Sequence, residues 1–452
     1  MTERREDNMN PWWSAFARVS LAAAFATIPR VAFALDISGL EHARVQPPVY
    51  FAISHKRDLD TMAPLGRILF YRDWRSLTKE VRFAMRSDSF EPGFLARAVA
   101  IPRWVRAFLR LVRPISVGPI LRGLGVYPLT DYSMRPGETW IREYLRVEGD
   151  TPVGDTPVGD TLAPWMIQRL AEAANNDPDA VARLMLSWLM AWRFHDPLQP
   201  RVGPDMFAGA ARRRAERRVV ETVKAELEAI AGWMRRGGSL YGSPEGRLSP
   251  DGRISPITSG LHRILREAHP ETRLVTIMIV YDFMTTHRKR MFVTLAPPIE
   301  RVPQIPQRTL DEALRHAWLR SARFTCTQLG AAFLVRRAQT AQMGDEPFTL
   351  DECTDAIAAE AHALAEQGRQ VDRRLLTQRG ARERVCGFLA FAARRGYIQP
   401  ADRGHWLSAP GDLTVDVPAW DVGYRDFPLG YAWNEYNEMG AVSEPLALPG
   451  AG

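Results

Sequence analysis

The chain has 452 residues, a net charge of +7 and 46% hydrophobic residues. This length suits two or three domains with sizeable cores, and the apolar fraction is typical of a globular protein. The basic balance favours anionic partners such as nucleic acid, anionic lipid or a phosphorylated substrate. Three cysteines without close spacing argue against a disulfide framework and a zinc site, and nine scattered histidines show no metal-ligand spacing. We predict no metal.

The N-terminal stretch is apolar but broken by charges. Residues 11–35, PWWSAFARVSLAAAFATIPRVAFAL, are interrupted by Arg18 and Arg30, and the apolar runs between them are too short to cross a bilayer. We predict that residues 1–45 lie on a membrane surface as an amphipathic segment, with tryptophans at the headgroup level. A signal peptide is the alternative, because AFA at residues 32–34 is similar to a cleavage site.

A second basic stretch follows the first predicted strands. Residues 93–130 carry six arginines and no acidic residue. A helix would align Arg103, Arg106, Arg110 and Arg113 on one face, which suits an anionic membrane surface. The alternative is a solvated face of a helix that packs on the core. Together with the N-terminal segment, this stretch predicts a peripheral protein at the cytoplasmic face of a membrane.

Predicted strands and helices alternate along residues 49–300, which is an α/β pattern. The repeat GDTPVGDTPVGDT, residues 149–161, is rich in turn-forming residues and predicts a loop without core positions. Residues 162–235 then predict a helical insertion that contains one long helix with a basic start. Strands are predicted at residues 51–54, 81–87, 273–283 and 290–300, and helices from residue 62 and at residues 259–269.

These patterns define the expected domains. We predict an α/β domain over residues 46–305, with a mixed sheet flanked by helices and a helical insertion at about residues 150–235. Further helical patterns predict a separate helical module over residues 306–400. Residues 401–452 form an aromatic, turn-rich tail, which either packs on the domain or contacts a partner; the sequence does not decide between these.

The stretch FAISHKRDLD, residues 51–60, contains a candidate catalytic pair. His55 stands at a predicted strand end, and Asp60 stands in the first turn of the following helix. A carboxylate that accepts a hydrogen bond from one ring nitrogen leaves the other nitrogen able to take a proton from a hydroxyl group. Asp58 is a competing partner for the histidine, and such spacings also arise by chance.

A second candidate is the turn-rich stretch YGSPEGRLSPDG, residues 241–252. Proline and glycine predict a tight loop in which the Glu245 carboxylate and the Arg247 guanidinium point into one place. Arginine suits bidentate binding of a phosphate. Taken alone, the stretch is more simply a surface turn with a local ion pair.

Together and in this order, the two stretches resemble the motifs of the glycerolipid acyltransferase family, which includes the glycerol-3-phosphate and lysophosphatidate acyltransferases. His55 and Asp60 correspond to the family's H-x4-D motif, and SPEGRLS corresponds to its F-P-E-G-T-R-S motif. FAMRSD around Arg86 and PILRGLGVYPLTD at residues 119–131 are similar to intermediate motifs. The resemblance covers about residues 49–300, and only the joint pattern is specific.

This resemblance implies an O-acyltransferase of phospholipid or related lipid biosynthesis. It implies transfer of a fatty acyl group from acyl-CoA or acyl carrier protein to a hydroxyl group, with no cofactor and no acyl-enzyme. His55 would be the general base, and Asp60 would orient it and stabilise its charged form. The substrate-binding residues that it implies are Glu245, Gly246, Arg247, Arg86 and Arg253.

The chain departs from the family where a phosphate would bind. Arg247 stands where the family has threonine, and Thr130 and Asp131 stand where the second motif usually nears an arginine. Arg135 and Arg142 are the nearest arginines to that motif. The acceptor is therefore either a glycerol phosphate or an unphosphorylated lipid or sugar alcohol.

Other function classes stay open at this point. The main alternative is a catalytically inactive, membrane-associated binding or scaffold protein on the same fold. A hydrolase is a third reading, although the sequence contains no G-x-S-x-G nucleophile elbow. Nucleic-acid binding rests only on net charge and on one basic helix that also carries acids, and we predict no nucleic-acid partner.

Overall fold

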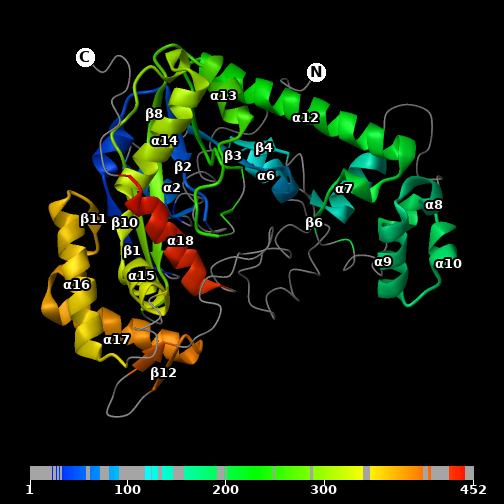
Figure 1. Ribbon diagram of the computed structural model, residues 1–452. Coiled ribbons are helices and arrows are strands. Elements are labelled where there is room, and N and C mark those ends of the chain that lie inside the picture. Colours follow the sequence, from blue (N-terminus) through cyan, green and yellow to red (C-terminus); the bar gives the residue numbers. More distant parts are fainter. Residues whose placement is uncertain are drawn as a thin grey trace. The chain divides into compact units, whose positions relative to one another are not determined.

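The structure is a computed structural model of the chain, and its described residues form two compact units. The smaller unit consists of the described residues within Phe83–Ala231, and the larger unit of those within Met9–Arg82 and Gly232–Gly452. Figure 1 shows their helices and strands. The described residues are 23, 27, 30, 33–56, 62–71, 81–90, 118–123, 125–130, 135–145, 157–190, 198, 201–246, 248–249, 251–285, 289–339, 347–400, 406–408 and 427–442.

The larger unit is built on a mixed sheet. Its strands are β1 (Ala34–Ser38), β2 (Val49–Ile53), β7 (Ser239–Gly242), β8 (Arg273–Asp282) and β9 (Arg290–Leu295). They follow the order β1-β9-β8-β2-β7. β2 is parallel to both neighbours, with Phe51 opposite Tyr241 and Val275, whereas β8 and β9 are antiparallel. The carboxyl ends of β2, β7 and β8 therefore lie at one edge of the sheet.

The central position of β2 follows from its sequence. All residues of VYFAI are buried, as an unbroken apolar run predicts for a strand covered on both faces. Trp318 of α14 (Gln307–Ser321) donates a hydrogen bond from Nε1 to the carbonyl oxygen of Ala52, 3.1 Å away. This bond satisfies a buried indole and fixes α14 beside the strand.

Helices flank this sheet and continue into the C-terminal part of the same unit. Here α15 packs against α16, α17 and α18 (Figure 1). A Cβ added at Gly330 in α15 would lie 2.7 Å from the ring of Phe388 in α17, so glycine permits this close crossing. The helices are α2 (Met62–Tyr71), α13 (Ser259–Arg266), α15 (Cys326–Gln339), α16 (Leu350–Glu366), α17 (Gln378–Arg394) and α18 (Pro428–Gly440).

Short elements complete the larger unit. Two small pairs of strands lie among its helices, one parallel and one antiparallel. They are β10 (Arg323–Phe324) with β11 (Gln370–Val371), and β12 (Ile398–Pro400) with β13 (Trp406–Ser408). The 3-10 helices are η2 (Leu40–Arg44), η8 (Val302–Gln304) and η9 (Arg373–Leu376).

The smaller unit combines a parallel strand pair with a helical part. Phe83 of β3 lies opposite Val126 of β4. The long helix α12 begins in this unit, and its last residues, from Gly232, belong to the larger one. The elements are β3 (Val81–Arg86), η3 (Ser87–Phe90), α6 (Gly118–Gly123), β4 (Val126–Leu129), β5 (Arg135–Pro136), α7 (Gly137–Leu145), α8 (Val158–Thr161), α9 (Pro164–Ala174), α10 (Pro178–Ala182), η5 (Leu186–Met190), β6 (Arg201–Val202), η7 (Pro204–Met206) and α12 (Gly209–Arg235).

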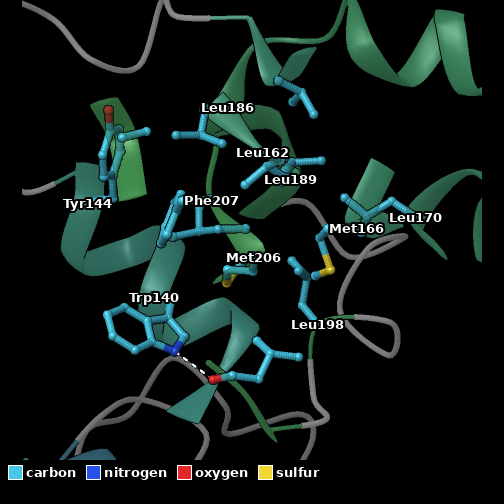
Figure 2. Close-up of a cluster of buried hydrophobic side chains, with 14 of the residues drawn as sticks. Trp140, Tyr144, Leu162, Met166, Leu170, Leu186, Leu189, Leu198, Met206 and Phe207 are labelled. Atoms are coloured by element: carbon cyan, nitrogen blue, oxygen red, sulfur yellow. Dashed lines mark hydrogen bonds between the residues drawn. The ribbon is translucent and has the colours of Figure 1, made fainter. Parts of the chain in front are cut away.

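The helical part of the smaller unit has its own hydrophobic core (Figure 2). Trp140 donates from Nε1 to the carbonyl oxygen of Val202 at 2.8 Å and meets the ring of Phe207 edge-on. Val158, in the second copy of the tandem repeat, is fully buried in this core. The prediction that the repeat has no core positions was therefore wrong, because one valine of the repeat starts the short helix α8.

The structure confirms an α/β chain with a mixed sheet flanked by helices, and the predicted strands around residues 51, 81, 273 and 290. The structure differs from the prediction at Ala34–Ser38. These residues belong to the predicted membrane segment, but they form β1 beside β9. The arginine-rich stretch before residue 118 lies outside the described residues. The two compact units divide the chain at other positions than the predicted domains do. The predicted domain boundaries remain predictions. Within the part of the chain that the structure describes, no helix is long and apolar enough to cross a membrane.

Candidate functional site

The candidate site lies where two neighbouring parallel strands of the larger unit end. His55 follows β2, and Glu245 follows β7, with Ala52 paired to Gly242 as the last register partners of the two strands. In open α/β sheets, ligands bind outside the carboxyl ends of such strands. The two motifs of the acyltransferase resemblance thus meet at one edge of the sheet.

A single carboxylate connects the two motifs. Oε2 of Glu245 accepts the backbone N–H of His55, and Oε1 accepts the backbone N–H of Ser255, each at 2.7 Å. The side chain is buried, and Glu245 is only 4% exposed. Burial raises the pKa of Glu245 to about 7, while the two backbone hydrogen bonds and the charge of Lys56 act to lower that pKa. Around pH 7 the group is therefore close to the point where it gains or loses a proton.

The loop after β7 holds His55 from its other side as well. Ser249 donates its backbone N–H to the carbonyl oxygen of His55 at 2.9 Å. Thr258 donates both its backbone N–H and its hydroxyl to the carbonyl oxygen of Pro244, which closes the loop on itself. Gly246 has a φ of +66°, which a glycine adopts without strain, and Thr258 leaves little space for a Cβ there. Both backbone polar groups of His55 are thereby bonded to this loop.

A buried charge pair stands directly beside His55. The Nζ atom of Lys56 contacts Oε1 of Glu435 in α18, and their side chains are 3% and 1% exposed. Oε2 of Glu435 accepts a hydrogen bond from Nε2 of Gln328 at 2.7 Å. Oε1 of Gln328 in turn accepts the backbone N–H of Thr325 at 3.1 Å. The pair is thus supported by further hydrogen bonds, as a buried ion pair requires.

The remaining predicted site residues have different outcomes. Asp60 and Arg247 lie outside the described residues, so their predicted roles stay predictions. Arg86 ends β3 in the smaller unit. Gly246 lies next to Glu245 and is exposed. The Arg253 side chain is 62% exposed, with Nε 3.9 Å from the Asp251 carboxylate and a guanidinium nitrogen 3.3 Å from Oδ1 of Asn434.

A second, partly buried glutamate lies at the end of β4 in the smaller unit. Glu226 of α12 accepts the backbone N–H of Thr130 at 2.7 Å and the hydroxyl of Thr130 at 2.9 Å. Burial raises the pKa of Glu226 to about 7. The candidate phosphate ligands nearby are themselves paired with carboxylates: Arg135 contacts Glu143, and Arg142 lies 2.5 Å from Glu138.

The described residues also contain one cavity of note. It has a volume of about 450 Å³, and its apolar wall includes Phe33, Leu35 and Leu40, with Arg30 and Arg67 as its charged residues. This is the size of a small-molecule pocket. Among the described residues, no group of three or more histidine, cysteine, aspartate and glutamate side chains could hold a metal ion.

Sequence reasoning missed the side chains that surround His55. It treated Lys56 as one basic residue of HKRDLD and left the C-terminal tail undecided. The signal was present in NEYNEMG of that tail: Glu435 and Glu438 are three residues apart, so a helix places both acids on one face. Two acids on one face of an otherwise uncharged helix favour partners for those acids, although the pattern does not specify which.

A comparison with models of known protein families gave no match, and a search of curated proteins gave none either. The resemblance therefore rests on the motifs themselves and on the contact between them.

Proposed function

We propose that the protein is an O-acyltransferase that moves a fatty acyl group from acyl-CoA or acyl carrier protein to a hydroxyl group of a lipid or sugar alcohol. The observation that supports this most is the bond between the Glu245 carboxylate and the backbone of His55. A histidine after one strand and a glutamate loop after its neighbour are the two parts that the resemblance requires together. Chance matches of two short motifs would not generally be in contact.

The proposed reaction needs only a base and a positioned thioester. One ring nitrogen of His55 takes the proton from the acceptor hydroxyl while the oxygen attacks the thioester carbonyl carbon. The C–S bond then breaks, and the thiolate that leaves takes the proton from the histidine. An ester and a free thiol are the products. Positioned general-base help of this kind contributes about 10²–10⁴-fold to a rate.

The substrate-binding part of the proposal concerns charge and apolar surface. Arg135 and Arg142 are each paired with a carboxylate, whereas the Arg253 side chain is mostly exposed. Of these three arginines, Arg253 is thus the candidate for contact with an anionic acceptor or an anionic acyl donor. The cavity beside Phe33 offers apolar surface to a hydrocarbon chain. Binding at an anionic membrane, as a peripheral protein of its cytoplasmic face, would supply lipid acceptors.

An inactive binding or scaffold protein on the same fold is the second candidate. It is favoured by the departures from the family's phosphate-binding positions, since a fold can keep its catalytic histidine while losing its substrate. The two candidates differ in whether a thioester is cleaved.

The test is release of free thiol from long-chain acyl-CoA and from acyl carrier protein by the purified protein, with and without a panel of hydroxyl acceptors. We expect release that depends on an acceptor and falls by at least about 10²-fold in His55→Ala. The matched control is His316→Ala, a change of a histidine on α14. Release without any acceptor would indicate a hydrolase. No release from either donor by the folded protein would support the scaffold.

A further inference from the structure

The C-terminal helix α18 makes contacts with both segments of the candidate site. Glu435 pairs with Lys56, the residue after His55. One turn away, Oε2 of Glu438 accepts the backbone N–H of Ile254 at 2.7 Å. Asn434 donates from Nδ2 to the carbonyl oxygen of Asp251 at 3.1 Å. Three side chains of one helical turn thus hold the segment after β2 and the loop after β7.

The loop also approaches the backbone of α18 closely. Gly252 has a φ of +92°, and a Cβ added there would lie 2.3 Å from the carbonyl oxygen of Tyr431. Glycine is therefore required by conformation and by space at this contact. Glu438 is held from outside by Arg315 of α14, which contacts its other oxygen. The helix is fixed on one side and bonded to the loop on the other.

The Lys56–Glu435 pair has little tolerance for change. Glu435 receives two donors, the Lys56 ammonium on Oε1 and the Gln328 amide on Oε2. A glutamine at this position has one acceptor oxygen for these two donors. A flip of the Gln328 amide would not restore the lost hydrogen bond, because the Gln328 oxygen already accepts from Thr325. One of the two donors would then lose its bond to residue 435, and the ammonium would lose the carboxylate that it contacts.

We propose that α18 is a positioning element of the site, in which Glu435 holds Lys56 and so sets the place of His55, while Glu438 and Asn434 hold the loop that carries Glu245. This inference rests on the proposed acyl transfer for its kinetic consequence. Its structural part concerns the protein without substrate. The helix touches no reacting atom in this proposal, so Glu435 and Lys56 are positioning residues.

The first readout reports on His55 without any substrate. The protein contains nine histidines, so labelling with [¹⁵N]histidine gives nine backbone amide signals. The His55 signal is the one that disappears in His55→Ala. Its N–H donates to the Glu245 carboxylate, so the signal moves when that bond lengthens. We expect Glu435→Gln to move the His55 signal more than any of the other eight.

Kinetics supply the second readout. We expect Glu435→Gln and Lys56→Met each to lower kcat by at least about tenfold while KM stays within about threefold, because misplacement of a base affects the chemical step. Tyr436→Phe is the matched control. Tyr436 is the next residue of α18, and its hydroxyl contacts Arg336 and Glu360 instead of the site. This variant should leave both kcat and the His55 signal unchanged.

The double variant Lys56→Met/Glu435→Gln separates positioning from stability. It removes both charges, and the new amide side chain keeps one acceptor oxygen for the one remaining donor, so the melting temperature should recover towards that of the wild type. If the pair positions His55, kcat stays low. Recovery of kcat together with the melting temperature would overturn the inference. So would a Glu435→Gln protein with wild-type kcat and an unmoved His55 signal.

Failure of the proposed function gives a different pattern. A wild-type protein that cleaves no thioester refutes the acyl transfer, and the displacement of the His55 signal alone then decides on the positioning role of α18. If a single variant does not fold, the kcat of the neutral double variant decides instead.

Discussion

Each unit has one glutamate at the end of a parallel strand, Glu245 buried and Glu226 partly buried, and desolvation raises the pKa of both to about 7. Glu245, in the larger unit, accepts the backbone N–H groups of two residues, His55 and Ser255. Glu226, in the smaller unit, accepts the backbone N–H and the hydroxyl of one residue, Thr130. Glu245 thus connects two segments, whereas Glu226 caps a single strand end.

The hydrogen-bond donors that each carboxylate binds determine which side chain can replace that glutamate. A backbone N–H can only donate, so both oxygens of Glu245 must remain acceptors. The Thr130 hydroxyl can also accept, so one oxygen of Glu226 is replaceable by an N–H donor. The substitution of glutamate by glutamine should therefore have opposite results at these two positions.

The largest effect is expected for Glu245→Gln. The amide nitrogen would face one of two N–H donors, so either His55 or the loop at Ser255 loses its anchor. A displacement of the base of this kind reduces a rate by about 10²-fold. We expect such a loss in acceptor-dependent thiol release, with Glu312→Gln, an exposed glutamate on α14, as the unaffected control. An activity within twofold of the wild type would remove Glu245 from the site.

The same carboxylate predicts the pH dependence of the wild-type activity. Protonation of Glu245 likewise leaves one acceptor oxygen too few for the two backbone N–H groups that it binds. Activity should therefore fall as the pH drops through about 7, and the rates are measured in steps between pH 6 and pH 9.

A smaller effect of opposite sign is expected for Glu226→Gln. The folded-state pKa of Glu226 is raised from 4.5 to about 7, so this group stabilises the fold fully below pH 4.5, and the contribution is lost as the pH rises through about 7. Glutamine resembles the protonated form, and its amide can donate to the Thr130 hydroxyl. We expect equal stability near pH 4.5 and a variant more stable by about 3 kcal/mol at pH 8, from about 1.4 kcal/mol per pKa unit.

Urea unfolding of the two proteins at both pH values measures this difference. Groups that titrate in both proteins, Glu245 included, cancel in the comparison. A difference that does not change with pH would mean that Glu226 is not held in a desolvated place. If Glu226→Gln also lowered thiol release as strongly as Glu245→Gln, both glutamates would serve the same reaction.

The sequence predicted those features of the fold that depend on local patterns. The unbroken apolar run of VYFAI predicted a buried strand, and the long helix predicted for residues 211–237 is observed as Gly209–Arg235. The meeting of His55 and Glu245 was predicted only through the joint order of two motifs. Neither motif alone distinguishes a catalytic loop from a surface turn.

Features that depend on distant partners could not be predicted. Val158 lies in a turn-rich repeat, and only its packing against helices from earlier and later in the chain makes its position part of a core. Glu435 pairs with a residue 379 positions earlier in the sequence, and no local pattern specifies such a partner. The tail therefore looked undecided, although it forms a helix whose acids contact the candidate site.

The smallest effect on stability is expected for Arg253→Ala, a change that tests contact between the loop after β7 and the substrate. The Arg253 side chain is 62% exposed, and its contacts with Asp251 and Asn434 are long, so the free energy of unfolding should change by less than about 0.5 kcal/mol. The loop that Glu245 holds would then keep its shape. If the acceptor carries a phosphate that Arg253 binds, KM for that acceptor should rise by about tenfold, while KM for an unphosphorylated acceptor stays unchanged. Arg308→Ala, which removes an arginine that is 93% exposed on α14, controls for net charge. Equal KM values in Arg253→Ala and the wild type would exclude Arg253 from the acceptor site, and the loop after β7 would then serve to hold His55 and not to bind the anion.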